Sequence, residues 1–135
     1  IPRAVARQRM AEGLAHMGLG DQADAVVRSL SGGTRRKVEL VRALLHEPRV
    51  LLMDEATVGL DPASRVQLLQ AVQDLQREQG VATLWATHLV EEVEHADRVI
   101  VLHKGAIRHQ GRVADLLTDT GQASVQAAFL SLTRV

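Results

Sequence analysis

Cysteine is absent from the 135-residue sequence, and aromatic residues are almost absent. The lack of cysteine excludes disulfide bonds and thiolate metal sites. Trp85 and Phe129 are the only aromatic side chains. Because Trp85 lies inside an apolar run, we predict that it packs in the core and does not stack on a base.

An excess of charge and a long apolar run are also missing. Basic and acidic residues number 16 each, so the formal net charge is zero. This balance argues against a strongly basic nucleic-acid surface and an acidic tail. No apolar run approaches the roughly 20 residues that a membrane helix needs, and no signal peptide is recognisable. The first residue is Ile1 and not methionine, from which we expect a truncated start.

Apolar residues make up 46% of the sequence, enough for the core of one domain. They alternate between strand-length runs and helical stripes, the pattern of an α/β fold. The continuous run at 50–53 predicts a parallel strand that is covered on both faces, and the strand at 81–87 is predicted to be buried too. Helices are predicted at about 4–18, 32–45, 62–79, 90–95, 113–117 and 122–132, and strands at 50–53, 81–87, 99–102 and 106–109.

Asp54 and Glu55 directly follow the first of these strands. The carboxyl end of a parallel strand borders the crevice in which α/β sheets bind ligands. An aspartate there can hold Mg²⁺, since hard cations prefer oxygen ligands, and a neighbouring glutamate can orient or deprotonate an attacking water. The alternative is an ordinary strand end before a helix cap, which is the better explanation for this pair taken alone.

Ser31, Gly32 and Gly33 open the second predicted helix. Two glycines at a helix start allow an anion to approach the backbone, where free N–H groups and the helix dipole favour phosphate oxygens. The hydroxyl of Ser31 can add a donor. Taken alone, these residues are better explained as a helix N-cap after a loop.

Two further patterns follow along the chain. Asp61 belongs to Gly59-Leu60-Asp61-Pro62, which by itself is explained by a turn with an aspartate cap. His88 follows the strand at 81–87 and by itself is explained as an ordinary histidine at a helix start. An imidazole at a strand end can also hydrogen-bond a γ-phosphate oxygen. Neither pattern identifies a function without the others.

The order and spacing of these patterns resemble the second half of an ATP-binding cassette (ABC) ATPase. Leu30-Ser31-Gly32-Gly33, the strand ending in Asp54-Glu55, Gly59-Leu60-Asp61-Pro62 and His88 follow one another as the signature, Walker B, D-loop and H-loop motifs do in that family. The helix after the family's signature often reads Arg-Arg-x-x-Glu-Leu-x-Arg-Ala-Leu, and residues 35–44 match it. The resemblance covers about residues 4–118.

The resemblance implies an α/β fold: part of a P-loop NTPase (ABC ATPase) core with a mostly parallel sheet, preceded by part of the helical signature subdomain. Residues 1–46 would belong to that subdomain and residues 47–118 to the C-terminal part of the α/β core. Residues 119–135 would form a helical tail of unassigned role.

The resemblance also implies a role for each motif. Asp54 belongs to the Mg²⁺ shell, Glu55 is the catalytic carboxylate, and His88 is the catalytic residue that senses the γ-phosphate. The remaining residues act across a head-to-tail dimer of two ABC ATPase subunits. Ser31, Gly32 and Gly33 bind the γ-phosphate of ATP held by the second subunit, and Asp61 couples the two ATP sites.

One motif of such ATPases is absent. The sequence contains no Gly-x-x-x-x-Gly-Lys-Ser/Thr loop, and its only lysines are Lys37 and Lys104. We therefore predict that these residues alone bind ATP and Mg²⁺ weakly or not at all, whereas the full-length protein is an ATP hydrolase. Thr34 also departs from the family, in which glutamine or glutamate frequently follows the two glycines.

The implied function is that of the ATP-hydrolysing subunit of an ABC transporter, peripheral on the cytoplasmic face of the cell membrane. Its partners would be transmembrane permease subunits, and not nucleic acid. The helix at 35–44 favours export over nutrient import. Two alternatives stay open: a soluble ABC ATPase of the translation or DNA-repair type, and a non-catalytic interaction fragment.

In the family, the phosphate-loop strand lies between the strands that correspond to 81–87 and 99–102. Without it, the sheet has a gap with unpaired backbone groups. We expect an isolated chain of these residues to be marginally stable, or to fill the gap by dimerising or swapping.

Overall fold

The computed structural model describes residues 1–134, which form two compact units. The first unit is Ile1–Ala86, and the second begins at Thr87. Each unit has its own hydrophobic cluster. The division at residues 46 and 118 expected from the family remains a prediction.

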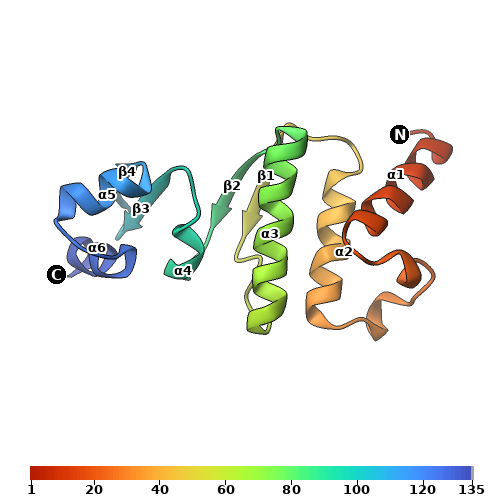
Figure 1. The fold of residues 1–135 in the computed structure, drawn as a ribbon, viewed down its shortest axis with the longest axis horizontal. Helices are drawn as coiled ribbons and strands as arrows, with labels where there is room; N and C mark the ends of the chain where they lie inside the picture. The colour runs from red at the N-terminus through yellow and green to blue at the C-terminus, as the bar shows by residue number, and fades with distance from the viewer. Residues whose placement is uncertain (135) are drawn as a thin grey trace. The chain divides into compact units, whose positions relative to one another are not determined.

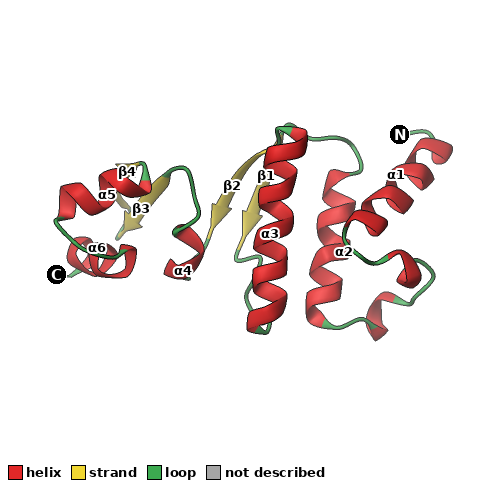
Figure 2. Ribbon diagram, viewed as in Figure 1, coloured by secondary structure: helices red, strands yellow, loops and turns green. Residues whose placement is uncertain are grey.

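The first unit contains three α-helices and two strands (Figure 1). Helix α3 lies between the two strands and α2, and the turns η1 and η2 connect α1 to α2 (Figure 2). The bounds are α1 Arg3–His16, η1 Gly20–Gln22, η2 Val27–Ser29, α2 Gly32–Leu44, β1 Val50–Asp54, α3 Pro62–Gln79 and β2 Ala82–Ala86.

The second unit consists of a hairpin and short helices. Strands β3 and β4 pair antiparallel, with an irregularity between Val101 and Leu102. The bounds are α4 Val90–Val93, β3 Val99–His103, β4 Ala106–Gly111, α5 Val113–Thr120 and α6 Val125–Thr133. None of the described helices, in either unit, is both long enough and apolar enough to cross a membrane.

The core of the first unit forms where α3 meets α2 and the strands. Leu68, Val72 and Leu75 of α3 are buried, at the helical spacing that the sequence predicts. Trp85 of β2 is partly buried and packs against this cluster, which confirms that it is a core residue. Gly80 ends α3 in the left-handed conformation that glycine adopts readily.

Strands β1 and β2 pair in parallel, as the predicted α/β class requires. Leu51 and Trp85 point toward the helices, whereas Leu52 and Leu84 are 72% and 60% exposed. For the described first unit, two predictions are therefore wrong: that the strand at 50–53 is covered on both faces, and that the strand at 81–87 is buried. An apolar run specifies a strand that prefers cover on both faces, but the helices of residues 1–86 cover only one.

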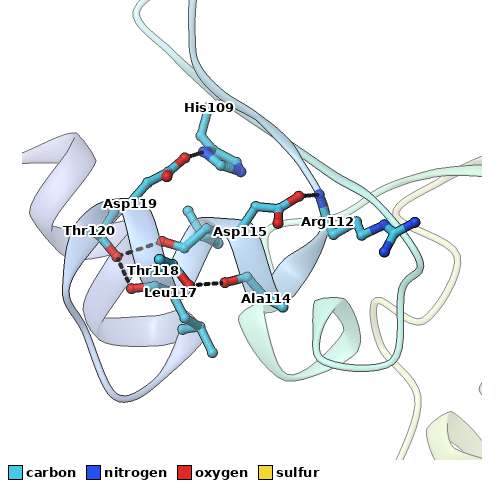
Figure 3. Close-up of polar contacts among 9 residues, drawn as sticks. His109, Arg112, Ala114, Asp115, Leu117, Thr118, Asp119 and Thr120 are labelled. Carbon is cyan, nitrogen blue, oxygen red and sulfur yellow. Dashed lines mark hydrogen bonds and ion pairs between the residues drawn. The ribbon is translucent and has the colours of Figure 1, made fainter.

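Polar contacts lie at both ends of helix α5 of the second unit, and one of them reaches the preceding strand (Figure 3). The backbone N–H of Arg112 donates to Oδ2 of Asp115 at 3.0 Å, at the first turn of the helix. Near the last turn, Oδ2 of Asp119 lies 3.6 Å from Nδ1 of His109 on β4. Leu116 of α5 is completely buried in the core of this unit.

Candidate functional site

The candidate site begins at the carboxyl end of β1. Asp54 is exposed and lies on the same sheet face as Leu52, and Glu55 is half-buried. The backbone N–H of Glu55 donates to the carbonyl of Ala86 at 2.9 Å, which ties the two strand ends together. Glu55 has a φ of 49°, in the left-handed region that costs a non-glycine residue about 1 kcal/mol. Strained backbone of this kind is concentrated at functional sites.

A tight turn leads from Glu55 to helix α3. The backbone N–H of Val58 donates to the carbonyl of Glu55 at 3.1 Å, and that of Leu60 donates to the carbonyl of Thr57 at 3.0 Å. Thr57 and Leu60 are buried, so the turn is anchored in the core. The turn thereby fixes the spacing between the acidic end of β1 and the start of α3.

Asp61 is the N-cap of α3 and binds Ser64 with both carboxylate oxygens. The backbone N–H of Ser64 donates to Oδ1 at 3.0 Å, and its hydroxyl donates to Oδ2 at 2.6 Å. The hydroxyl bond, followed by the backbone bond, lowers the pKa of Asp61 below its ordinary value of 3.8. Asp61 is therefore a stable, exposed anion at the start of the helix.

Ser31 is the N-cap of α2, which confirms the cap expected from the sequence. Its hydroxyl accepts a hydrogen bond from the backbone N–H of Thr34 at 3.2 Å. The hydroxyls of Ser31 and Thr34 also lie 2.9 Å apart, within hydrogen-bond distance. Thr34 thus restrains the Ser31 side chain at the start of α2.

The starts of α2 and α3 lie against each other. A Cβ atom added to Gly33 would lie 2.5 Å from Oγ and 2.8 Å from Cβ of Ser64, closer than real atoms pack. A Cβ on Gly32 would lie 3.8 Å from Cδ2 of Leu60. The structure therefore brings together Ser31-Gly32-Gly33 and Asp61, which the sequence places about 30 residues apart. Two helix N-termini side by side offer free N–H groups and positive dipole ends to an anion.

His88 belongs to the second unit, in the segment between β2 and α4. Its side chain is exposed. The backbone N–H of Leu89 donates to the hydroxyl of Thr87 at 3.0 Å, which shapes the loop around it. The role expected for His88 rests on its place in the sequence and remains a prediction.

The donor set at the end of β1 fits Mg²⁺. Asp54 and Glu55 are neighbours in the sequence and both carry a carboxylate, and Mg²⁺ is commonly held by one or two carboxylates together with waters and substrate phosphates. The part of the chain that the structure describes contains no cluster of three or more potential metal-ligating residues. A cation here would accordingly take the rest of its ligands from phosphate and water.

Neither Ser64 nor Thr34 was assigned a role in this site from the sequence. Each stands three residues after a cap, since Ser64 follows Asp61 and Thr34 follows Ser31. A polar residue at this distance from a capping residue is a recognisable helix-start signal. The spacing predicts the two local bonds, but the contact between Ser64 and Gly33 is visible only in the fold.

An ABC transporter family model matches residues 4–58. The chain is also 41% identical over 130 residues to the methionine import ATP-binding protein MetN of Thermobifida fusca. The chain is similar to part of an ABC transporter ATPase domain. The match to MetN covers 96% of this chain and 40% of that relative.

Two further ABC proteins show the same similarity. The aliphatic sulfonates import ATP-binding protein SsuB of Mycobacterium avium is 44% identical over 111 residues, covering 82% of this chain and 44% of SsuB. A solved inward-facing conformation of a putative metal-chelate type ABC transporter superposes with a TM-score of 0.81 at 28% identity, covering 87% of this chain and 47% of that one. The chain thus spans less than half the length of each of these three ABC proteins.

Proposed function

We propose that this chain supplies the hydrolytic half of an ATP site in the ATP-hydrolysing subunit of an ABC transporter. The observation that supports this proposal best is the meeting of two helix starts, one opened by Ser31-Gly32-Gly33 and the other by Asp61. Similarity to ABC transporter ATPases makes ATP the ligand to expect at such a site. The principal phosphate grip, a glycine-rich loop with a lysine, is not in this sequence and would come from other residues.

The acidic strand end would perform the chemistry. Mg²⁺, when bound, neutralises charge on the β- and γ-phosphates, and Asp54 would hold it directly or through water. Glu55 would orient the attacking water and accept its proton. Its backbone bond to Ala86 and the anchored turn behind it hold the Glu55 backbone in place. His88 would contact the γ-phosphate.

The signature turn, Ser31-Gly32-Gly33, would act on ATP held by a second ABC ATPase subunit. The starts of α2 and α3 present N–H groups that suit a γ-phosphate bound to the opposing subunit. Asp61 stands next to this turn, where it would connect the two ATP sites of a head-to-tail dimer. Closure of the dimer around ATP would drive transmembrane permease subunits.

The subunit would be peripheral, on the cytoplasmic face of the membrane. We infer the direction of transport from the names of the similar proteins and not from the helix at residues 35–44. Two of the similar proteins are named as import ATP-binding proteins, for methionine and for aliphatic sulfonates. The expectation of export, drawn from residues 35–44, receives no support from these names. We therefore propose import, and we leave the substrate open.

A chimera tests the hydrolytic role. In MetN of Thermobifida fusca, the 130 matching residues are replaced by those of this chain, and Mg-dependent ATP hydrolysis is measured. We expect hydrolysis in the chimera and a fall in kcat of about 100-fold or more with Glu55→Gln, while ATP binding is retained. Glu78→Gln, on the exposed surface of α3, is the matched control and should leave kcat unchanged.

A second measurement tests whether the phosphate-binding part of the ATP site is supplied by residues outside this sequence. Isothermal titration of the 135-residue chain with Mg-ATP should show no binding at micromolar concentrations, because the phosphate loop is absent. Micromolar binding would contradict this expectation. A folded, ATP-binding chimera whose kcat is the same with and without Glu55→Gln would contradict the assignment of the catalytic carboxylate.

A further inference from the structure

Ser64 is the residue that joins the two parts of the candidate site. Its hydroxyl donates to Oδ2 of Asp61 at 2.6 Å, and its backbone N–H donates to Oδ1 at 3.0 Å. On its other side, the same side chain fills the space in which a Cβ of Gly33 would stand. Ser64 therefore has one contact to the D-loop aspartate and one to the signature turn.

Both contacts are tight enough to transmit a displacement. A hydroxyl-to-carboxylate hydrogen bond of 2.6 Å is short and charge-assisted, so it restrains the side chains at both ends. The contact with Gly33 is close because residue 33 has no side chain; an added Cβ would lie 2.5 Å from Oγ of Ser64. A shift of Gly33 toward α3 would have to move the Ser64 side chain, since close-packed atoms do not interpenetrate.

We propose that Ser64 is a positioning residue that couples the carboxylate of Asp61 to the signature turn Ser31-Gly32-Gly33. An anion drawn onto the signature turn would displace the Asp61 carboxylate through Ser64, and a change at Asp61 would be felt at Gly33. The inference rests on the proposed function, in which the signature turn and Asp61 serve two ATP sites of one dimer. Within one subunit, the inference assigns the connection between the signature turn and Asp61 to the side chain of Ser64.

The coupling is measured without nucleotide, by NMR spectroscopy of the ¹⁵N-labelled 135-residue chain at neutral pH. Asp61→Asn should change the amide chemical shifts of both Ser64 and Gly33, because the carboxylate contacts Ser64 and Ser64 contacts Gly33. In the Ser64→Ala background, Asp61→Asn should shift the Gly33 amide at least about threefold less. The Ser64→Ala amide at position 64 should still respond to Asp61→Asn, since the backbone bond to Oδ1 remains.

A control variant shows that the effect is specific to this hydroxyl. Ser124→Ala removes the capping hydroxyl of α6, which accepts from the backbone N–H of Ala127 in the second unit. In that background the response of Gly33 to Asp61→Asn should equal that of the unaltered chain. The proposal is overturned if Gly33 does not respond to Asp61→Asn, or responds equally with and without the Ser64 hydroxyl.

The chimera with MetN supplies the functional readout. Ser64→Ala should lower kcat about tenfold and leave KM for ATP unchanged, because positioning and not binding is lost. An unchanged kcat in an active chimera would overturn the functional part of the inference. An inactive chimera would count against the proposed hydrolytic function, and the nucleotide-free NMR experiment would still decide whether Ser64 couples the two motifs.

Discussion

Leu52 on β1 and Leu84 on β2 lie opposite each other in the parallel register, and both point away from the helices of the first unit. Val50, on the same face, is 58% exposed. Neighbouring exposed apolar residues on a strand pair are uncommon in a monomer and favour association. The free edges of a two-stranded sheet add unpaired backbone groups that another chain can pair with.

We therefore predict that the isolated 135-residue chain self-associates. Light scattering should give a mass above that of the 14.7 kDa monomer, and the double variant Leu52→Thr/Leu84→Thr should return it to the monomer mass. Threonine suits strands, so the variant removes apolar surface without a large loss of strand propensity. Leu130→Thr, at an exposed position of α6, is the control and should not change the mass. A stable, cooperatively unfolding monomer of the unaltered chain would refute the prediction.

The local parts of this site are predictable from the sequence because local rules govern them. Ser31 and Asp61 precede helices and are N-caps in the structure, and α3 ends at Gln79, where the predicted helix ends. These features need only the chemistry of a few adjacent residues. The parallel strand pair and the helical core stripe were also predictable, because hydrophobic periodicity specifies them.

The remaining parts depend on contacts between distant residues. Nothing in the sequence near Gly33 indicates that Ser64 will stand against it, since the packing of α2 on α3 creates that contact. The exposure of Leu84 was not predicted for a related reason. An apolar run shows that a strand is suited to burial on both faces, but other segments of the fold determine which faces are covered. The expected role of His88 depends on the placement of another unit and remains a prediction.

The hairpin of the second unit offers a test of local backbone preference. Lys104 and Gly105 join β3 to β4 with φ values of 50° and 75°. Positive φ at both positions is typical of a type I′ turn, in which asparagine followed by glycine is preferred. Lys104→Asn should therefore raise the free energy of unfolding of this unit by about 0.5 kcal/mol. Gly105→Ala should lower it by about 1 kcal/mol or more.

Urea unfolding of both variants, followed by amide signals of the hairpin, measures the two effects. Lys104→Ala is the control, because alanine has no preference for positive φ and should give no gain. A loss of stability with Lys104→Asn would show that the two residues do not form this turn.

Asp61 predicts a pH dependence of stability with a definite sign. Its folded-state pKa lies below the ordinary value of 3.8, chiefly because of the hydroxyl of Ser64. The stabilisation is therefore fully present above the unfolded-state pKa near 3.8, and it is lost as the pH falls through the lower folded-state value. Asp61→Asn keeps a capping side chain but removes the titrating group.

Urea titrations between pH 2.5 and about pH 6 test this sign. The unaltered chain should lose more stability on acidification than Asp61→Asn does. Ser64→Ala should reduce the pH dependence, because it removes the largest cause of the lowered pKa. Identical pH profiles for the chain and the Asp61→Asn variant would contradict the prediction.

Gly13 of α1 packs directly on Val41 of α2, and this contact reverses the usual effect of glycine in a helix. Glycine inside a helix is normally about 1 kcal/mol less favourable than alanine, so Gly13→Ala should stabilise by propensity alone. However, a Cβ at position 13 would lie 2.8 Å from Cγ1 of Val41. Val41 is only 4% exposed and its branched side chain has little room to move, so the strain of about 1–3 kcal/mol should outweigh the gain.

The sign of the effect should depend on residue 41. In the unaltered background, Gly13→Ala should lower the free energy of unfolding of the first unit by about 1 kcal/mol. In the Val41→Ala background, which lacks Cγ1, the same substitution should raise it by up to about 1 kcal/mol. Ala11→Gly, at an exposed position of α1, calibrates the propensity difference by costing about 1 kcal/mol. If Gly13→Ala stabilises the unit equally in both backgrounds, α1 and α2 do not pack through this contact in solution, because only that contact makes the two backgrounds differ.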